Sequence, residues 1–238
     1  MTQTEARLPG AGAGSIGFLM AYVPTLWNRP LIDESLARWD IFFGIDWPGL
    51  YRWVYESPMI EKTLWLAYLS MPYQIAFAVL VFSLTSDHAR NNDLWWVAAI
   101  SAAITSIVWG LWPSLGPLHH FAMLGNPAES LAPTAGGHVM VVQELRGGVK
   151  KIIHASQASG IVSFPSYHTA GALYLIYIFR SYRIFAGVLM LNILMLLAIP
   201  IIGEHYIADM AGGAAVVLCS IWITRRLMSA LQSRQRTV

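Results

Sequence analysis

Long apolar stretches alternate with short polar segments along most of the chain, and six of them are candidates for membrane-spanning helices. A helix needs about 20 apolar residues to cross roughly 30 Å of hydrocarbon, so each stretch can be compared with one crossing. The six cover residues 8–27, 59–84, 94–112, 167–179, 184–202 and 206–224. The fourth is short for a crossing unless its helix begins within the preceding turn, "FPSYH".

The segment between the first two stretches has a different pattern. Residues 31–57 mix Trp, Tyr, Arg and Asp, which is typical of helices that lie along the headgroup region of a bilayer. No internal repeat or linker separates a second domain. We therefore predict an all-α polytopic membrane protein, in which residues 1–238 form one integral membrane domain with about six transmembrane helices and an interfacial helical segment.

The composition also indicates a lipid environment. Hydrophobic residues make up 56% of the 238 residues and charged residues 12%, whereas soluble domains are about a quarter charged. The formal net charge of +2 is too small to indicate a nucleic-acid partner. A single cysteine, Cys219, excludes a disulfide within the chain.

Clusters of arginine predict the orientation of the chain in the membrane. The positive-inside rule places the loop "RSYR" and the tail "RRLMSALQSRQR" in the cytoplasm. An even number of crossings then puts both termini in the cytoplasm and the long loop 113–165 on the other side. That loop holds Arg146, Lys150 and Lys151, against the topological preference. Either these charges bind a ligand or the orientation is reversed.

Two short motifs contain residue types that suit catalysis. In "GEHYIADMAGG", residues 203–213, His205 and Asp209 are four apart and share one face of a helix, where the carboxylate can orient the imidazole. His168 of "FPSYHT" lies 37 residues earlier. A helix of 37 residues is about 55 Å long, which is enough to cross the membrane once and return. The helical hairpin therefore returns both histidines to one membrane face, where the long loop also emerges.

The motif "FPSYHT" has the features of a helix start. Pro165 suits the approach to a first turn and Ser166 can cap it, which leaves unpaired N–H groups that favour an anion. Two histidines, an orienting aspartate, a helix start and nearby positive charge together favour phosphoryl transfer through a phosphohistidine.

These motifs resemble the second and third signature motifs of the type 2 phosphatidic acid phosphatase superfamily, six-helix membrane enzymes that act on lipid phosphates without a metal. The resemblance implies that His205 attacks phosphorus, that Asp209 holds this histidine, and that His168 protonates the leaving oxygen. It also implies that Ser166 contacts a phosphate oxygen.

The cationic positions of that superfamily carry other residues here. Its first motif has a lysine seven residues before an Arg-Pro pair; this chain has Tyr22 before Arg29-Pro30, in another region. The arginine six residues before the nucleophilic histidine is replaced by Ile199. Such departures resemble the branch of inositol phosphorylceramide synthase, whose members often transfer a phosphorylated head group between lipids.

We predict that the long loop supplies the missing positive charge. The candidates are Arg146 with Lys150 or Lys151, in the turn "LRGGVKK". Tyr167 in "FPSYHT" and His120 in "WPSLGPLHH" are further phosphate-binding candidates. The expected protein is a lipid phosphatase or phosphotransferase with no cofactor and no metal, with its active site on the non-cytoplasmic face. Its substrate would be a membrane lipid phosphoester, and in transfer a lipid or head-group hydroxyl would be the acceptor.

Two alternatives stay open. The histidines and the aspartate could be metal ligands, although the chain has no His-Glu-x-x-His sequence and clustered cations would repel a divalent ion. The protein could also be a non-catalytic lipid carrier that retains the phosphate pocket. His119, His138 and His154 are interpreted as structural, and Glu204 either as a surface carboxylate or as a group that tunes the histidine after it.

Overall fold

The computed structural model describes residues 21–124, 137–148 and 160–235, and in these residues the protein is all-helical, as predicted. The short 3-10 helix η1 (Pro24–Trp27) is followed by ten α-helices. These are α2 (Asp33–Phe42), α3 (Trp47–Tyr55), α4 (Pro58–Leu69), α5 (Met71–Leu84), α6 (His88–Leu111), α7 (Pro117–Met123), α8 (Gly137–Arg146), α9 (Tyr167–Phe179), α10 (Phe185–Ile202) and α11 (Ile207–Gln235).

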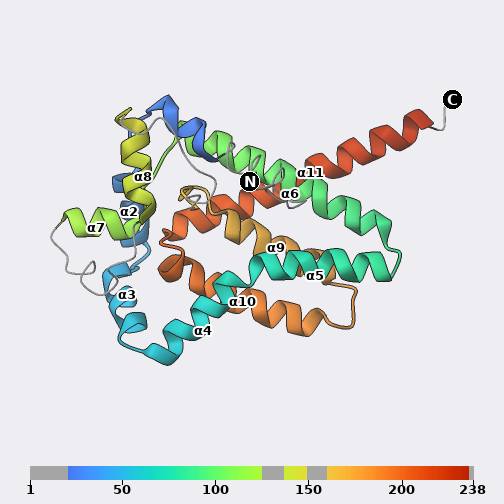
Figure 1. The fold of residues 1–238 in the computed structure, drawn as a ribbon, viewed down its shortest axis with the longest axis horizontal. Coiled ribbons are helices and arrows are strands. Elements are labelled where there is room, and N and C mark those ends of the chain that lie inside the picture. The colour runs from blue at the N-terminus through green and yellow to red at the C-terminus, as the bar shows by residue number, and fades with distance from the viewer. Residues whose placement is uncertain (1–20, 125–136, 149–159, 236–238) are drawn as a thin grey trace, which may run out of the picture.

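Helices α5, α6, α9, α10 and α11 form an elongated bundle, and shorter helices gather at one end of it (Figure 1). Within the bundle, α10 packs against α4 and α9, while α11 packs against α6 and α9. At the left end in Figure 1, α2, α3, α7 and α8 lie beside the ends of the bundle helices. The segment 31–57, predicted to be helical, accordingly forms α2 and α3 at this end.

Three helices are long and apolar enough to cross a membrane: α6, α10 and residues Ile207–Leu231 of α11. They match the third, fifth and sixth predicted stretches. Helices α4 and α5 pass the same test together but are bent by 44°, so they add a fourth crossing if the pair is one broken span. The predicted count of about six is not confirmed, because α9 has only 13 residues and most of the first stretch lies outside the described residues.

The break between α4 and α5 has a local cause. Pro72 follows the break and has no backbone N–H to donate to the carbonyl of Tyr68, four residues earlier. Ser70 lies at the break, where its hydroxyl donates to the carbonyl of Ala67 (2.6 Å). The second predicted stretch is therefore two helices joined at an angle.

Helix α9 lies at the centre of the bundle. Its buried residues Tyr174, Leu175 and Ile178 share one apolar core with residues of α5, α6 and α11. The apolar character of α9 thus reflects burial among other helices. Its N-terminal end lies beside the start of α11, which brings the two sequence motifs to the same end of the bundle.

Candidate active site

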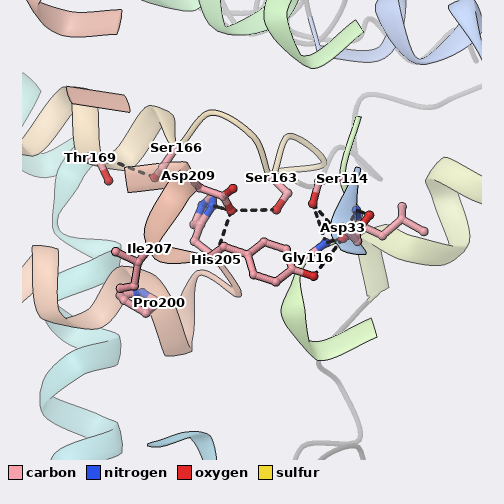
Figure 2. A network of polar contacts seen from close by, with 12 residues as sticks. Asp33, Ser114, Gly116, Ser163, Ser166, Thr169, Pro200, His205, Ile207 and Asp209 are labelled. Carbon is pink, nitrogen blue, oxygen red and sulfur yellow. Dashed lines mark hydrogen bonds and ion pairs between the residues drawn. The ribbon is translucent and has the colours of Figure 1, made fainter. Parts of the chain in front are cut away.

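His205 and Asp209 are in contact at the junction of α10 and α11 (Figure 2). The distance from His205 Nδ1 to Asp209 Oδ2 is 3.1 Å, and the side chains are 5% and 0% exposed. His205 lies just before α11 and Asp209 lies in its first turn. Because Nδ1 faces the carboxylate, Nε2 is the ring nitrogen left to react.

Backbone and side-chain hydrogen bonds fix this pair. Asp209 Oδ2 also accepts from the N–H of Tyr206 (2.9 Å) and from Ser163 Oγ (3.3 Å). The N–H of His205 donates to the carbonyl of Pro200 in α10 (3.2 Å). The imidazole and its aspartate are therefore oriented by the protein itself.

The surroundings of His205 favour the uncharged ring. Burial lowers the pKa of His205 to about 4, and the charge of His138 acts in the same direction. A backbone hydrogen bond with Ser163 and the charge of Glu204 oppose these effects but are weaker. The ring is thus neutral near pH 7, with a lone pair free to attack an electrophile.

The start of α9 is capped as expected for "FPSYHT". Ser166 Oγ accepts a hydrogen bond from the N–H of Thr169 (3.3 Å), and the N–H of Ser166 donates to the carbonyl of Asp209 (3.0 Å). The hydroxyl of Tyr167 donates to the carbonyl of Ala98 in α6 (3.3 Å). Both predicted phosphate-binding side chains therefore already have partners within the protein.

His168 lies in the first turn of α9, and Tyr68 of α4 connects it with the His205 loop. The His168 and Tyr68 rings are stacked, with centroids 4.1 Å apart and planes inclined by 17°. A Cβ atom built on Gly203 would be 2.8 Å from Tyr68 Cε2 and 2.9 Å from His205 Cδ2. Tyr68 therefore lies next to both histidines, and the structure brings the two motifs together beside its ring.

Two glycines of "GEHYIADMAGG" allow this close approach. A Cβ atom on Gly213 would be 2.3 Å from the carbonyl oxygen of Ser166, and one on Gly212 would be 2.9 Å from Pro165 Cβ. A side chain at either position would push α11 away from the start of α9. Their role in close packing is therefore direct, because the two motifs meet across them.

Asp33 of α2, which sequence reasoning did not select, organises a loop next to the pair (Figure 2). Its Oδ1 accepts hydrogen bonds from Ser114 Oγ (2.8 Å) and from the N–H of Gly116 (2.8 Å). The same oxygen accepts a longer one from the hydroxyl of Tyr206 (3.3 Å). Asp33 thus joins the loop after α6 to the residue that follows His205.

Asp40, also in α2, is a second residue near the site that the sequence motifs did not reveal. Its carboxylate accepts a hydrogen bond from the N–H of Ile207, the first residue of α11 (3.0 Å). Burial raises the pKa of Asp40 to about 6, the charge of Asp209 adds to this, and the hydrogen bond from Ile207 opposes it. Two aspartates seven positions apart were the available signal, because this spacing places them on one face of a helix.

Comparison with known protein families supports what the two motifs indicated. A family model described as "PAP2 superfamily" matches residues 34–223, from α2 into α11. The chain belongs to the PAP2 superfamily. No curated protein and no solved structure matches the chain. PAP2 members are generally phosphatases, so membership indicates phosphatase or phosphotransferase activity on phosphoesters.

In the signature motif of this superfamily, an arginine lies six residues before the nucleophilic histidine. The position corresponding to it here is apolar in the structure as well as in the sequence. Ile199 is fully buried in α10, and its carbonyl accepts the N–H of Gly203 (3.1 Å). The alternative of a metal site has no support in the described part of the chain. No group of three or more His, Cys, Asp or Glu side chains there is arranged so that it could hold an ion.

The predicted substitutes for the PAP2 cations are placed as follows. Arg146 is the last residue of α8, and its Nη2 donates to the carbonyl of Arg29 (2.6 Å). His120 is half-buried in α7. Lys150 and Lys151 lie outside the described residues. The roles of these four residues as phosphate ligands stay predictions.

Proposed function

We propose that this protein is a membrane lipid phosphatase or phosphotransferase that acts through a phosphohistidine and needs no metal. One observation carries the proposal: the buried contact of 3.1 Å between His205 Nδ1 and Asp209 Oδ2. It leaves Nε2 as an oriented nucleophile, and burial keeps the ring uncharged. A histidine in this state is suited to attack phosphorus.

The reaction consists of two displacements at phosphorus. In the first, the lone pair of His205 Nε2 attacks phosphorus, the bond to the leaving oxygen breaks, and His168 donates a proton to that oxygen. Burial and the charge of His205 lower the pKa of His168 to about 3, so it holds this proton only next to the anionic phosphate of the bound substrate. In the second, His168 takes a proton from water or an acceptor hydroxyl, whose oxygen attacks phosphorus as the P–N bond breaks. Asp209 stabilises the positive charge on the His205 ring between these steps.

A small apolar pocket beside α9 adjoins the proposed active site. It lies between α5, α6 and α9, and its lining includes Met71, Leu94 and Tyr167. Tyr167 directly precedes His168 in the chain. The pocket, with a volume of about 20 Å³, is too small for an acyl chain, but it shows that the helix surface next to the proposed active site is apolar and so compatible with a lipid.

The distribution of arginine supports an active site on the non-cytoplasmic face. Arg225 and Arg226 lie toward the C-terminal end of α11, whereas His205 precedes its first residue. Figure 1 shows that end of α11 projecting from the side of the bundle opposite α2 and α8. Under the positive-inside rule the basic end is cytoplasmic, so the proposed site faces the other side.

Hydrolysis and transfer differ only in the second displacement, and we favour transfer. The departures at Tyr22 and Ile199 resemble the inositol phosphorylceramide synthase branch, whose members often pass a phosphorylated head group to another lipid. A sphingolipid or diacylglycerol hydroxyl would then be the acceptor.

The test uses purified protein, labelled phospholipids and lipid phosphates, with and without diacylglycerol or ceramide. Free phosphate as product indicates hydrolysis, and a new labelled phospholipid indicates transfer. His205→Ala should abolish both products and the acid-labile phosphate trapped on the wild-type enzyme. His88→Ala, which removes an exposed histidine at the start of α6, should change neither. Lipid binding without product from the wild type would contradict the proposal and favour a carrier.

A further inference from the structure

A second histidine–carboxylate pair lies next to His205. His138, near the start of α8, has its Nδ1 3.9 Å from Glu204 Oε2, and the two side chains are 16% and 11% exposed. Glu204 directly precedes His205. We propose that His138, held by Glu204, is an electrostatic residue of the proposed site: with both ring N–H groups directed at protein oxygens, its positive charge acts through space next to His205 and attracts the substrate phosphate. This inference rests on the proposed function and deepens it.

The placement of the His138 ring suits a cation. Its Nε2 is 3.0 Å from the carbonyl oxygen of Leu115, and Nδ1 faces the Glu204 carboxylate. When the ring carries both protons, each N–H therefore has an oxygen to donate to. The Leu115 segment is itself fixed, because Asp33 accepts its N–H at 3.0 Å.

The backbone at Glu204 makes this pairing possible. Glu204 has a φ of 53°, in the left-handed region that residues other than glycine seldom adopt. This conformation allows consecutive side chains to face different partners, Glu204 toward His138 and His205 toward Asp209. A Cβ atom on Gly116 would be 2.7 Å from the carbonyl oxygen of Glu204, so the loop packs directly against this turn. Backbone strain of this kind is often found at functional sites.

The charge of His138 acts at the proposed nucleophile. After burial, it is the largest influence that lowers the pKa of His205. A charged His138 therefore helps to keep His205 neutral and able to attack. It would also attract a phosphate group between the two rings, because developing charge on phosphate oxygens is stabilised by fixed cations.

This role would account for the missing PAP2 cations. Tyr22 and Ile199 stand where the family pattern has lysine and arginine, and both are buried side chains. His138 comes from another part of the chain, since α8 belongs to the long loop 113–165. The ligand class is a phosphate monoester or diester, and inorganic phosphate is the simplest probe of the site.

The experiment compares His138→Ala, His138→Gln and His138→Lys by kcat/KM, by competitive inhibition with orthophosphate, and by direct calorimetric binding of orthophosphate. His138→Ala should lower kcat/KM by about 100-fold, as loss of one electrostatic donor does, and should weaken phosphate binding. His138→Lys, which restores a charge, should recover at least about tenfold of that loss. His138→Gln, which can still donate to Leu115, should recover little, and His88→Ala should behave as wild type.

A purely structural His138 would give the reverse order, with recovery by Gln and none by Lys, and that result would overturn the inference. Unchanged kcat/KM and phosphate binding in His138→Ala, or failure of all three variants to fold, would overturn it too. Failure of the proposed function has a different signature, because the wild-type protein itself would then form no phosphohistidine at His205.

Discussion

The carboxylate of Asp40 accepts a hydrogen bond from the N–H of Ile207 at 3.0 Å, across 167 positions of the chain. Ile207 is the first residue of α11 and lies two residues after His205. The N–H groups at a helix start have no partners within the helix, and a carboxylate placed there stabilises them. Asp40 therefore acts as a cap supplied by another helix, and it fixes the helix end next to the proposed nucleophile.

Replacing Asp40 with Ala should lower kcat by between about tenfold and a hundredfold, because small misplacements of a reacting group have effects of this size. KM should change little, since Asp40 does not contact substrate. Asp40→Asn keeps an acceptor oxygen and should recover most of the activity. Steady-state kinetics with the labelled lipid substrate measures both constants.

Asp46→Ala is the matched control, because Asp46 accepts the N–H of Gly49 (3.1 Å) in the same way at the start of α3. Loss of that cap should lower the free energy of unfolding by about 1 kcal/mol and leave kcat unchanged. An equal fall in kcat for Asp40→Ala and Asp46→Ala would mean that Asp40 serves stability alone.

Gly213→Ala should separate the two motifs. Its Cβ would lie 2.3 Å from the carbonyl oxygen of Ser166, so α11 must move away from the start of α9. We expect a loss of at least about tenfold in kcat/KM together with a lower melting temperature. Gly187→Ala in α10 is the control, because nothing lies within 4 Å of a Cβ there, and it should be neutral or stabilising by up to about 1 kcal/mol. Wild-type activity in Gly213→Ala would show that the helices need not be this close.

The sequence was sufficient for the parts of the site that depend on local geometry. His205 and Asp209 are four residues apart and were predicted to meet; they do so at 3.1 Å, although His205 lies two residues before α11 and not on the helix itself. The order of α9, α10 and α11 follows from three apolar stretches joined by short loops. These features need no knowledge of how distant segments pack.

The remaining parts depend on contacts between segments far apart in the chain. Asp33, Asp40 and His138 reach the site only because α2 and α8 pack at one end of the bundle. The predicted count of about six crossings is not confirmed for a related reason, since apolar residues buried among helices and apolar residues facing lipid produce the same pattern. The apolar residues of the short helix α9 are buried among other helices. Their burial by α6 and α11 could be seen only in three dimensions.

Tyr68 should fix the orientation of the proposed acid His168, whose ring stacks on it at 4.1 Å. Tyr68→Phe keeps the stacked ring and should retain nearly full activity. Tyr68→Leu removes it, and kcat should fall by about tenfold with little change in KM. Tyr73→Leu, at a side chain that is 75% exposed, is the control. Equal effects of Phe and Leu at position 68 would argue against a role for the stacked ring.

The free energy of unfolding should depend on pH because His205 is buried. The pKa of His205 is lowered from 6.5 to about 4, so between these values the unfolded chain binds a proton that the folded protein does not. The free energy of unfolding therefore falls as the pH falls, by about 2 kcal/mol at pH 5 from this group. The pKa of Asp40 is raised from 3.8 to about 6, so this group acts in the opposite direction over nearly the same range.

Thermal unfolding in detergent between pH 8 and pH 5 should separate the two contributions. His205→Asn removes one destabilising contribution and leaves that of His168, whose pKa is lowered to about 3, so it should lose less stability on acidification than the wild type without becoming independent of pH. Asp40→Asn removes the stabilising one and should lose more. If both variants follow the wild-type pH dependence, then neither group changes its proton affinity on folding, and the neutral ring on which nucleophilic attack depends would owe nothing to its burial.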